Sequence, residues 1–562
     1  MNLRVPMTLV VFALLAFAFH SCGKSGGGLE NTAIVALSAD VENFNPILTT
    51  STVSSEVQYC LYPQMFDLTF DLARGRLIYK PGLVKRWEML DSGRAIKLVL
   101  RRDVRWENGL IVSPQDVKFT YELLGDPSVA SPQKHYVDDM IFTNGKFDLD
   151  KSIEILDDST MLFHFRRGHP NQLFYLTIPP LPKYVFKDIE PRSIRQHPAN
   201  LKPLSGGPYR FERWTRHQEI VFASNPKCTY PGPAILDGVI FRIITEPQTR
   251  LMELKKGTID LMWPVQPEDV DDLKESYREI RLETLPPRQY EYIAWANIDF
   301  QEYRKSGGKT IRPHRLFGET RVRQALTYAI DRKSILDAKL GKYGELAVGD
   351  ISPMFRWAIN TNLRPYPYSP EQARSLLRQA GWQDTDGDGV LDRNGVKFEF
   401  SLLYNVGNAR RAYAATVIQE NLKQVGIVVH LVPLEATVLY EKMNTKDYDA
   451  VLAGYNVSLS IDPADRWGSI DNPFNSAGFQ NDRVKELINL GMNAIDEEKA
   501  AYYWKELQAI LHQEQPFTFM YWIKDIVGVN RRLKQTNIST LGVLEGIGKW
   551  KIGDPRSSYS MD

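Results

Sequence analysis

The chain has 562 residues, a formal net charge of +1, and 43% hydrophobic and 24% charged residues. This length exceeds what one hydrophobic core usually serves, so we expect two or three lobes of ordinary globular composition rather than a disordered protein. A near-neutral chain without long charged runs lacks the electrostatic footprint of proteins that bind nucleic acid or anionic membranes.

The N-terminus has the pattern of an export signal. Arg4 precedes an apolar run over residues 7–19, which is too short to span a bilayer but suits the core of a signal peptide. We therefore expect residues 1–21 to be a signal peptide and residues 22–30 a flexible, glycine-rich tether. The sequence ending at Cys22 is similar to a bacterial lipobox, which implies a lipid on Cys22; simple cleavage and release is the alternative.

Residues 83–121 predict a β-hairpin, a second tight turn and a capped helix, in that order. Two extended runs, 87–89 and 95–100, flank Asp91-Ser92-Gly93, whose glycine can adopt the positive φ of a hairpin turn. Ser113 then supplies a helix N-cap, followed by a proline at the first helical position.

The same order of features resembles family 5 extracellular solute-binding proteins, the peptide and nickel receptors of ATP-binding-cassette (ABC) importers. Further segments similar to family motifs follow in the family's order along nearly the whole mature chain. They are SGGPYRFERW (205–214), TRLMELKKGTIDLMW (249–263), RVRQALTYAIDRKSIL (321–336), AGWQDTDGDGVLDRNG (380–395) and QENLKQVGIVVHL (419–431). The segment 321–336 is the most specific of them.

The resemblance implies an α/β fold with the two lobes of a type II periplasmic binding protein, in its large peptide-receptor form. The implied N-terminal lobe covers residues 31–292, with an extra subdomain at about 79–201. The second lobe covers 293–520, and residues 521–562 return to the first. Segments 290–300 and 517–529 are each predicted as a strand, and two such crossings would form a hinge that permits closure around a ligand.

The function implied by the resemblance is that of the substrate-binding component of an ABC importer. It would bind oligopeptides or dipeptides in a closing cleft and deliver them to membrane permease subunits served by a separate ATPase. We expect a monomer without a cofactor, on the periplasmic side of a bacterial membrane or at the cell surface, that meets the membrane only through the lipid on Cys22. A carrier of nickel chelates or other solutes, and a peptide-sensing lipoprotein, remain alternatives.

Enzymatic activity is the least favoured alternative. The chain lacks the His-Glu-x-x-His, Gly-x4-Gly-Lys-Ser/Thr and Gly-x-Ser-x-Gly patterns of common catalytic sites. Catalytic groups can still meet in space from distant positions.

The candidate ligand site lies in the loop after the predicted strand that begins at Tyr448. In the family this loop offers a carboxylate to the peptide amine, and its Asp-Pro step is matched by Asp462. The slightly earlier acid that dipeptide receptors use falls near Val457 or Ser458, which is a departure from the family pattern, so Asp462, or Asp465 as an alternative, would take this role. A turn residue that bonds its own backbone is the competing interpretation of Asp462. The other predicted ligand residues here are Tyr455, Asn456 and Ser458, with Trp467 either as a cleft wall or as core.

The first lobe contributes a second set of candidates. Residues 43–57 resemble the family's Asn/Pro loop, which opens toward the ligand, so Thr50, Ser51 and Thr52 are candidate hydrogen-bond partners. Helix capping is their alternative role. Arg356 and Arg364 could receive a carboxylate, with surface solvation as the alternative.

Two further features bear on metals and redox chemistry. Asp384, Asp386, Asp388 and Asp392 occupy positions 1, 3, 5 and 9 of a calcium-loop pattern, but position 12 is glycine, so calcium is a weak candidate beside a plain surface hairpin. Cys60 and Cys228 could pair in an oxidising compartment or remain buried free thiols.

Overall fold

The computed structural model describes residues 31–168 and 172–553. The predicted signal peptide, Cys22 and the tether lie outside these residues. None of the helices in the described ranges is long and apolar enough to cross a membrane.

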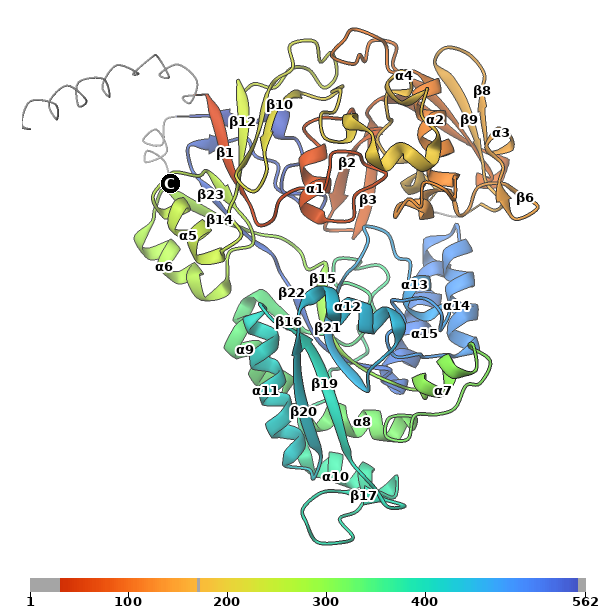
Figure 1. Cartoon of the computed structure of the whole chain (residues 1–562), viewed down its shortest axis with the longest axis vertical. Helices are drawn as coiled ribbons and strands as arrows, with labels where there is room; N and C mark the ends of the chain where they lie inside the picture. The colour runs from red at the N-terminus through yellow and green to blue at the C-terminus, as the bar shows by residue number, and fades with distance from the viewer. Residues whose placement is uncertain (1–30, 169–171, 554–562) are drawn as a thin grey trace, which may run out of the picture.

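The first lobe is built on a seven-stranded mixed sheet (Figure 1). β1 pairs in parallel with β12 and β13, whereas the remaining neighbours are antiparallel. In sheet order the strands are β10 (Tyr209–Thr215), β11 (Glu219–Ser224), β12 (Gly238–Ile243), β1 (Thr32–Leu37), β13 (Leu261–Met262), β23 (Ile526–Asn530) and β14 (Ile280–Thr284). The lobe also contains α1 (Thr52–Gln58), α5 (Pro247–Lys255), α6 (Val270–Ser276), the hairpin β2 (Phe66–Asp71)–β3 (Arg76–Pro81), and the C-terminal pair β24 (Leu533–Lys534) and β25 (Lys551–Ile552).

A smaller four-stranded sheet forms a subdomain of this lobe. Its order is β4 (Val84–Leu90), β5 (Ala95–Leu100), β9 (Thr160–His164) and β8 (Ile153–Ile155). Around it lie α2 (Pro114–Gly125), α3 (Leu149–Ser152), α4 (Lys183–Phe186) and the short pair β6 (Phe142–Thr143)–β7 (Lys146–Phe147).

The local prediction for this region is confirmed. β4 and β5 are antiparallel, and their turn has positive φ at Asp91, Ser92 and Gly93. Ser113 caps α2 in a capping box with Asp116, because the Ser113 hydroxyl accepts from the Asp116 amide while the Asp116 carboxylate accepts from the Ser113 amide.

The second lobe contains a six-stranded sheet with helices and loops packed around it. The sheet order is β16 (Gly344–Leu346), β22 (Phe517–Ile523), β15 (Gln289–Trp295), β21 (Ala450–Asn456), β19 (Glu399–Asn405) and β20 (Val428–Leu434). The helices are α7 (Phe300–Lys305), α8 (Thr320–Ala329), α9 (Arg332–Lys339), α10 (Pro370–Gln379), α11 (Ala409–Lys423), α12 (Ala436–Thr445), α13 (Ala464–Trp467), α14 (Asp482–Asn493) and α15 (Glu497–Glu514). A small hairpin, β17 (Asp392–Arg393)–β18 (Val396–Lys397), lies at the end of the lobe far from the first lobe (Figure 1).

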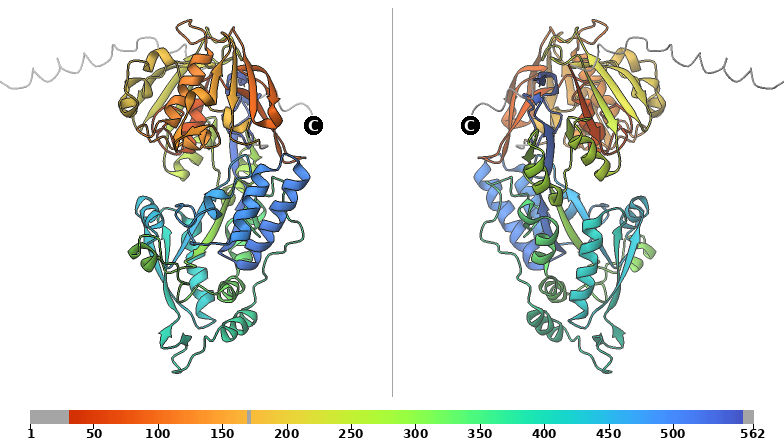
Figure 2. Two further views of the ribbon diagram at one scale, coloured as in Figure 1. Left: turned by 90° about the vertical axis from the view of Figure 1, so that its right-hand side faces the viewer. Right: turned by 90° about the vertical axis from the view of Figure 1, so that its left-hand side faces the viewer.

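Two segments cross between the lobes, and Figure 2 shows the two lobes and the region between them from the side. The chain passes from β14 to β15 through residues 285–288 and returns from β22 to β23 through Lys524 and Asp525. The predicted single strand at 517–529 is therefore wrong in detail, since it consists of two strands that belong to different sheets. The two-lobed α/β fold itself is confirmed.

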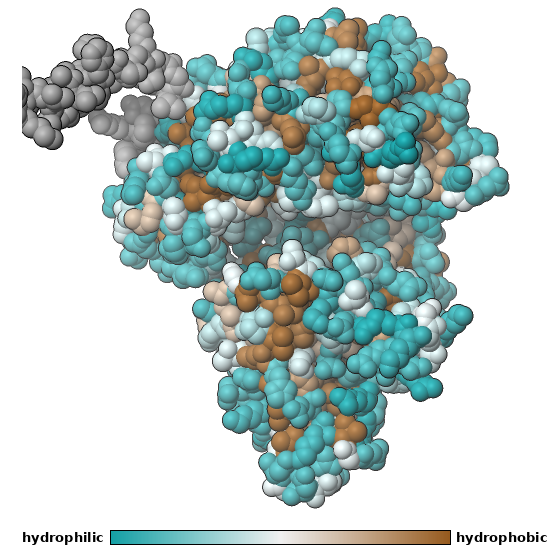
Figure 3. All heavy atoms as spheres, in the orientation of Figure 1, coloured by the Kyte–Doolittle hydropathy of each residue, from teal (hydrophilic) through white to brown (hydrophobic). Residues whose placement is uncertain are grey.

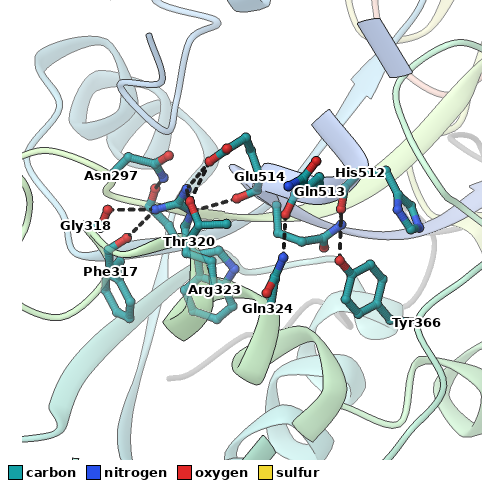
Figure 4. A network of polar contacts seen from close by, with 12 residues as sticks. Asn297, Phe317, Gly318, Thr320, Arg323, Gln324, Tyr366, His512, Gln513 and Glu514 are labelled. Carbon is teal, nitrogen blue, oxygen red and sulfur yellow. Dashed lines mark hydrogen bonds and ion pairs between the residues drawn. The ribbon is translucent and has the colours of Figure 1, made fainter. Parts of the chain in front are cut away.

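The most specific sequence motif, at 321–336, has an architectural role. The buried guanidinium of Arg323 in α8 donates to the carbonyls of Phe317 and Gly318 and to the carbonyl of Glu514 at the end of α15, at 2.8–3.0 Å (Figure 4). Gln324, the next residue, donates to the Gln513 carbonyl at 2.8 Å. Burial lowers the pKa of Arg323 to about 10. The motif thus joins two helix ends of the second lobe.

Candidate functional site

The candidate site is the cleft between the two lobes, visible as a hollow across the surface in Figure 3. On the second-lobe side, β21 runs toward the cleft and ends at Asn456. The loop that follows begins at Val457, whose amide donates to the carbonyl of Arg288 in the first crossing segment at 2.8 Å. The loop is therefore attached to the hinge where it starts.

Asp462 lies in this loop, half-buried. Its Oδ1 accepts a hydrogen bond from the Ala464 amide at 3.0 Å, so the predicted turn role is real. Burial raises the pKa of the Asp462 carboxyl, and the carboxylates of Asp465 and Asp139 raise it further. The hydrogen bond from the Ala464 amide and the charge of the Arg466 guanidinium act in the opposite direction and lower this pKa. No lysine or arginine of the described ranges forms an ion pair with Asp462. A cation entering the cleft would relieve this electrostatic deficit.

Asp465 is engaged within the lobe. Its carboxylate accepts from the Tyr455 hydroxyl and pairs with Arg466 at 3.0 Å. The Arg466 guanidinium also lies 4.4 Å from the centroid of the Tyr455 ring and donates to Asp350 at 2.9 Å. Of the two predicted carboxylates, Asp462 is therefore the one left for a ligand.

The subdomain of the first lobe supplies the opposite wall. Burial raises the pKa of the Tyr175 phenol, and Asp462 is the first of the charges that add to this rise. Burial lowers the pKa of His135, which the Asp465 carboxylate opposes. The 462–465 loop therefore lies near enough to His135 and Tyr175 for its carboxylates to act on their pKa values. The sequence analysis missed both, because they lie in short 3₁₀ helices, Lys134–Val137 and Phe174–Leu176, whose sequence pattern carries no sign of a cleft.

The first-lobe candidates form contacts of their own. The amide and hydroxyl of Thr50 both donate to the Glu42 carboxylate, at 2.8 and 2.7 Å. Ser51 is the N-cap of α1 and accepts from the Ser54 amide at 3.1 Å, while Thr52 is the first residue of that helix. The capping alternative thus describes Ser51, and a ligand role for the three residues stays a prediction.

The remaining candidates of the second lobe differ in accessibility. Asn456 is exposed and Ser458 is half-buried, with its hydroxyl accepting from the Ser460 amide at 3.3 Å. Trp467, however, is 0% exposed and packs against Phe479 and Phe517 in the core. The prediction that Trp467 walls the cleft is wrong, because its indole N–H is drawn inward to Asp350 at 2.7 Å.

Arg356 and Arg364 are both exposed. The Arg364 guanidinium donates to the carbonyls of Thr361 and Leu363, at 2.7 and 3.3 Å, in its own loop. This arrangement matches the surface alternative for Arg364.

The acidic hairpin lies far from the cleft. The carboxylates of Asp384, Asp386 and Asp388 lie within 4.8 Å of one another, but the Lys397 ammonium bonds to both Asp386 and Asp388. Asp392 does not join this group as the calcium pattern requires, because it turns inward and accepts from the amide and hydroxyl of Thr385.

The two internal cysteines do not pair. Cys60 and Cys228 are free and buried, and burial raises the pKa of each thiol. The free-thiol alternative is therefore the correct one.

A separate cavity of about 260 Å³ lies within the first lobe. It is lined by aromatic rings, including Tyr59, Phe66 and Tyr230, and by the carboxylate of Glu545. No residue of the 456–465 loop lines it, so it is distinct from the interlobe site.

Comparison with known proteins settles the family. The profile of the bacterial extracellular solute-binding proteins, family 5, matches residues 79–478. The chain belongs to this family. The chain is 27% identical to the oligopeptide-binding protein AppA of Bacillus subtilis, over 98% of both chains, and 24% identical to di/tripeptide-binding protein 1 of Pseudomonas aeruginosa, over 81% of this chain and 82% of that protein. As a member of family 5, it is an extracellular solute-binding protein.

Solved structures of the family share its fold. The structure of Bacillus subtilis AppA in complex with a nonapeptide has a TM-score of 0.77 at 26% identity and covers 93% of this chain and 99% of that one. NikZ of Campylobacter jejuni in complex with Ni(L-His) also has a TM-score of 0.77, at 23% identity, over the same shares of the two chains. The second likeness concerns the fold alone.

Proposed function

We propose that this protein is the substrate-binding component of an ABC importer that binds peptides in the interlobe cleft and delivers them to permease subunits. Two of its relatives carry the names of peptide-binding proteins, and one of them, AppA, has a structure in complex with a nonapeptide. The observation that carries the proposal is Asp462, a half-buried carboxylate at the cleft without an ion-pair partner among the described residues. A peptide's terminal ammonium is the complementary group.

The expected contribution of this contact follows from its chemistry. A hydrogen bond to a charged group contributes about 1.5–3 kcal/mol, which corresponds to roughly a 10- to 150-fold change in Kd. The ammonium would lower the pKa of Asp462 again by offsetting the repulsion from Asp465 and Asp139. Asp462 is therefore the amine partner in this proposal, and the other predicted ligand residues, Tyr455, Asn456 and Ser458, lie along the strand and loop that lead to it.

The proposal also covers the setting of the protein. The chain would be exported under its signal peptide and held at the outer side of a bacterial membrane by a lipid on Cys22, as a monomer without a cofactor. The apolar run before Cys22 and the glycine-rich segment after it support this placement.

The test uses the protein from residue 31 onward, denatured and refolded to remove carried ligand. The refolded protein is exposed to a mixed peptide pool, and retained molecules are identified by mass spectrometry. Calorimetry then compares Asp462→Asn with wild type, and with Asp384→Asn as the matched control on the distant exposed hairpin. Of the two variants, we expect only Asp462→Asn to weaken peptide binding, by at least 10-fold. We expect N-acetylated peptides to bind the wild-type protein as weakly as peptides with a free amine bind Asp462→Asn. If the refolded protein retained no peptide, the proposal would be overturned. If acetylated peptides bound wild type as tightly as peptides with a free amine do, Asp462 would not be the amine partner.

A further inference from the structure

A cavity of about 220 Å³ lies between the hairpin β2–β3 of the first lobe and the second lobe. Its walls come from both sides, with Leu77 and Tyr79 from the hairpin and Trp357, Ile461 and Trp504 from the second lobe. It is separate from the aromatic cavity within the first lobe, with which it shares no lining residue.

The hairpin is fitted closely onto the second lobe. The Trp357 indole donates to the Gly75 carbonyl at 3.0 Å, and Phe70 meets Phe355 edge-on with ring centroids 6.0 Å apart. Gly75 has φ +70°, and a Cβ there would lie 2.5 Å from the Arg356 amide nitrogen, so only glycine allows this approach. Both lobes therefore define the shape of the cavity.

More of the cavity lining is apolar than polar. Leu77, Phe355 and Trp504 contribute hydrocarbon surface, and the charges on Arg76 and Glu497 are paired with each other at 2.6 Å. Ile495, another lining residue, is 64% exposed and leaves apolar surface open to an incoming group.

The cavity adjoins the ligand loop. Leu459, Ser460 and Ile461 line it, and Asp462 is the next residue in the chain. Asp462 is therefore next to the cavity wall along the chain.

We propose that this cavity is a side-chain subsite that receives a bulky apolar side chain, of leucine to tryptophan size, from the amino-terminal end of the bound peptide. The inference rests on the proposed peptide-binding function and defines its substrate class. An apolar cavity of about 150 Å³ is large enough for benzene, so 220 Å³ accommodates an aromatic side chain. Because the walls belong to both lobes, a side chain placed there contacts both lobes in this arrangement.

Calorimetry on refolded protein tests the inference with two peptide series of equal length. One series varies only the two amino-terminal residues among Ala, Leu, Phe and Trp in an otherwise alanine-rich peptide, and the other places the same residues at the carboxyl end. We expect large apolar residues at the amino-terminal end to tighten binding by about 10- to 100-fold over Ala, with a smaller effect at the other end.

A cavity-filling variant assigns the effect to this site. Ala494 lines the cavity, and Ala494→Phe places a ring inside it; Ala409→Phe, at an exposed position that does not line it, is the control. We expect Ala494→Phe to bind the alanine peptide as wild type does but to lose the preference for bulky residues. Peptide binding without that preference would overturn the subsite and leave the peptide function standing. Retention of no peptide would overturn both. The peptide series decides without any variant if Ala494→Phe fails to fold.

Discussion

Removal of the Asp350 side chain tests the polar network that supports the ligand loop. Asp350 is 1% exposed, and its Oδ2 accepts from the Arg466 guanidinium at 2.9 Å and from the Trp467 indole at 2.7 Å. In Asp350→Ala both donors lose this acceptor. Arg466 keeps its second partner, Asp465, which in turn holds the Tyr455 hydroxyl.

The expected loss of stability can be built from these contacts. Breaking a buried ion pair by removing one partner costs about 3–5 kcal/mol, and a buried donor left without a partner costs about 1–3 kcal/mol. The two losses share one carboxylate and overlap, while Asp465 still compensates part of the Arg466 charge. We therefore expect Asp350→Ala to lower the free energy of unfolding by about 4 kcal/mol.

The assay is urea unfolding of the two proteins, combined with hydrogen exchange of the amides of α13. The exchange measurement is needed because a two-lobed chain need not unfold in one step. The double variant Asp350→Leu with Arg466→Met should recover more than half of the loss, since an apolar pair of similar volume often replaces a buried ion pair at little cost. A loss below about 1 kcal/mol, or no recovery in the double variant, would refute this account of the network.

Two further outcomes are expected. Burial raises the pKa of the Glu56 carboxyl to about 7, so from pH 4.5 to 7 the folded state holds a proton that the unfolded state releases, and the unfolding free energy falls as pH rises through that range. Glu56→Gln should reduce this slope by up to about 1.4 kcal/mol per pH unit, and an unchanged slope in urea unfolding at pH 5, 6 and 7 would contradict the assignment. At the distal hairpin, Lys397→Gln should free Asp386 and Asp388, so that millimolar Ca²⁺ raises the Tm of the variant but not of wild type; equal responses would show that Lys397 does not block the site.

Features set by neighbouring residues were predictable from the sequence. The Asp91–Gly93 turn and the Ser113 cap depend on contacts within a few residues, and the segment 321–336 resembles its family motif in consecutive residues. The two-lobed fold was predicted from that resemblance and not from the helix and strand propensities of individual residues. The division of segment 517–529 was harder, because both strands are uniformly buried and only the pair Lys524-Asp525 marks the crossing.

The role of a side chain in the site depended on residues far away in the sequence. The sequence left Trp467 either as a cleft wall or as core. Asp350, 117 residues earlier, decides for the core because it accepts a hydrogen bond from the indole of Trp467. Asp462 and Asp465 were both candidates for the carboxylate that binds the amine, and their position in the sequence did not decide between them. They become distinguishable only when Arg466 and Tyr455 are seen to engage Asp465. His135 and Tyr175 carry no periodic signal and reach the loop only through the fold.

Arg288 connects the ligand loop to the first crossing segment and to the C-terminal segment of the chain. Its guanidinium donates to the carbonyl of Val457 at 3.1–3.2 Å and to the carbonyl of Thr540, in the C-terminal segment of the chain, at 2.9 Å. Its own carbonyl accepts from the Val457 amide. Because Asp462 lies five residues after Val457, a group that binds Asp462 acts on a loop whose base is fixed to the first crossing segment. In the proposed function, Arg288 would thus connect the loop that holds the ligand with the first crossing segment.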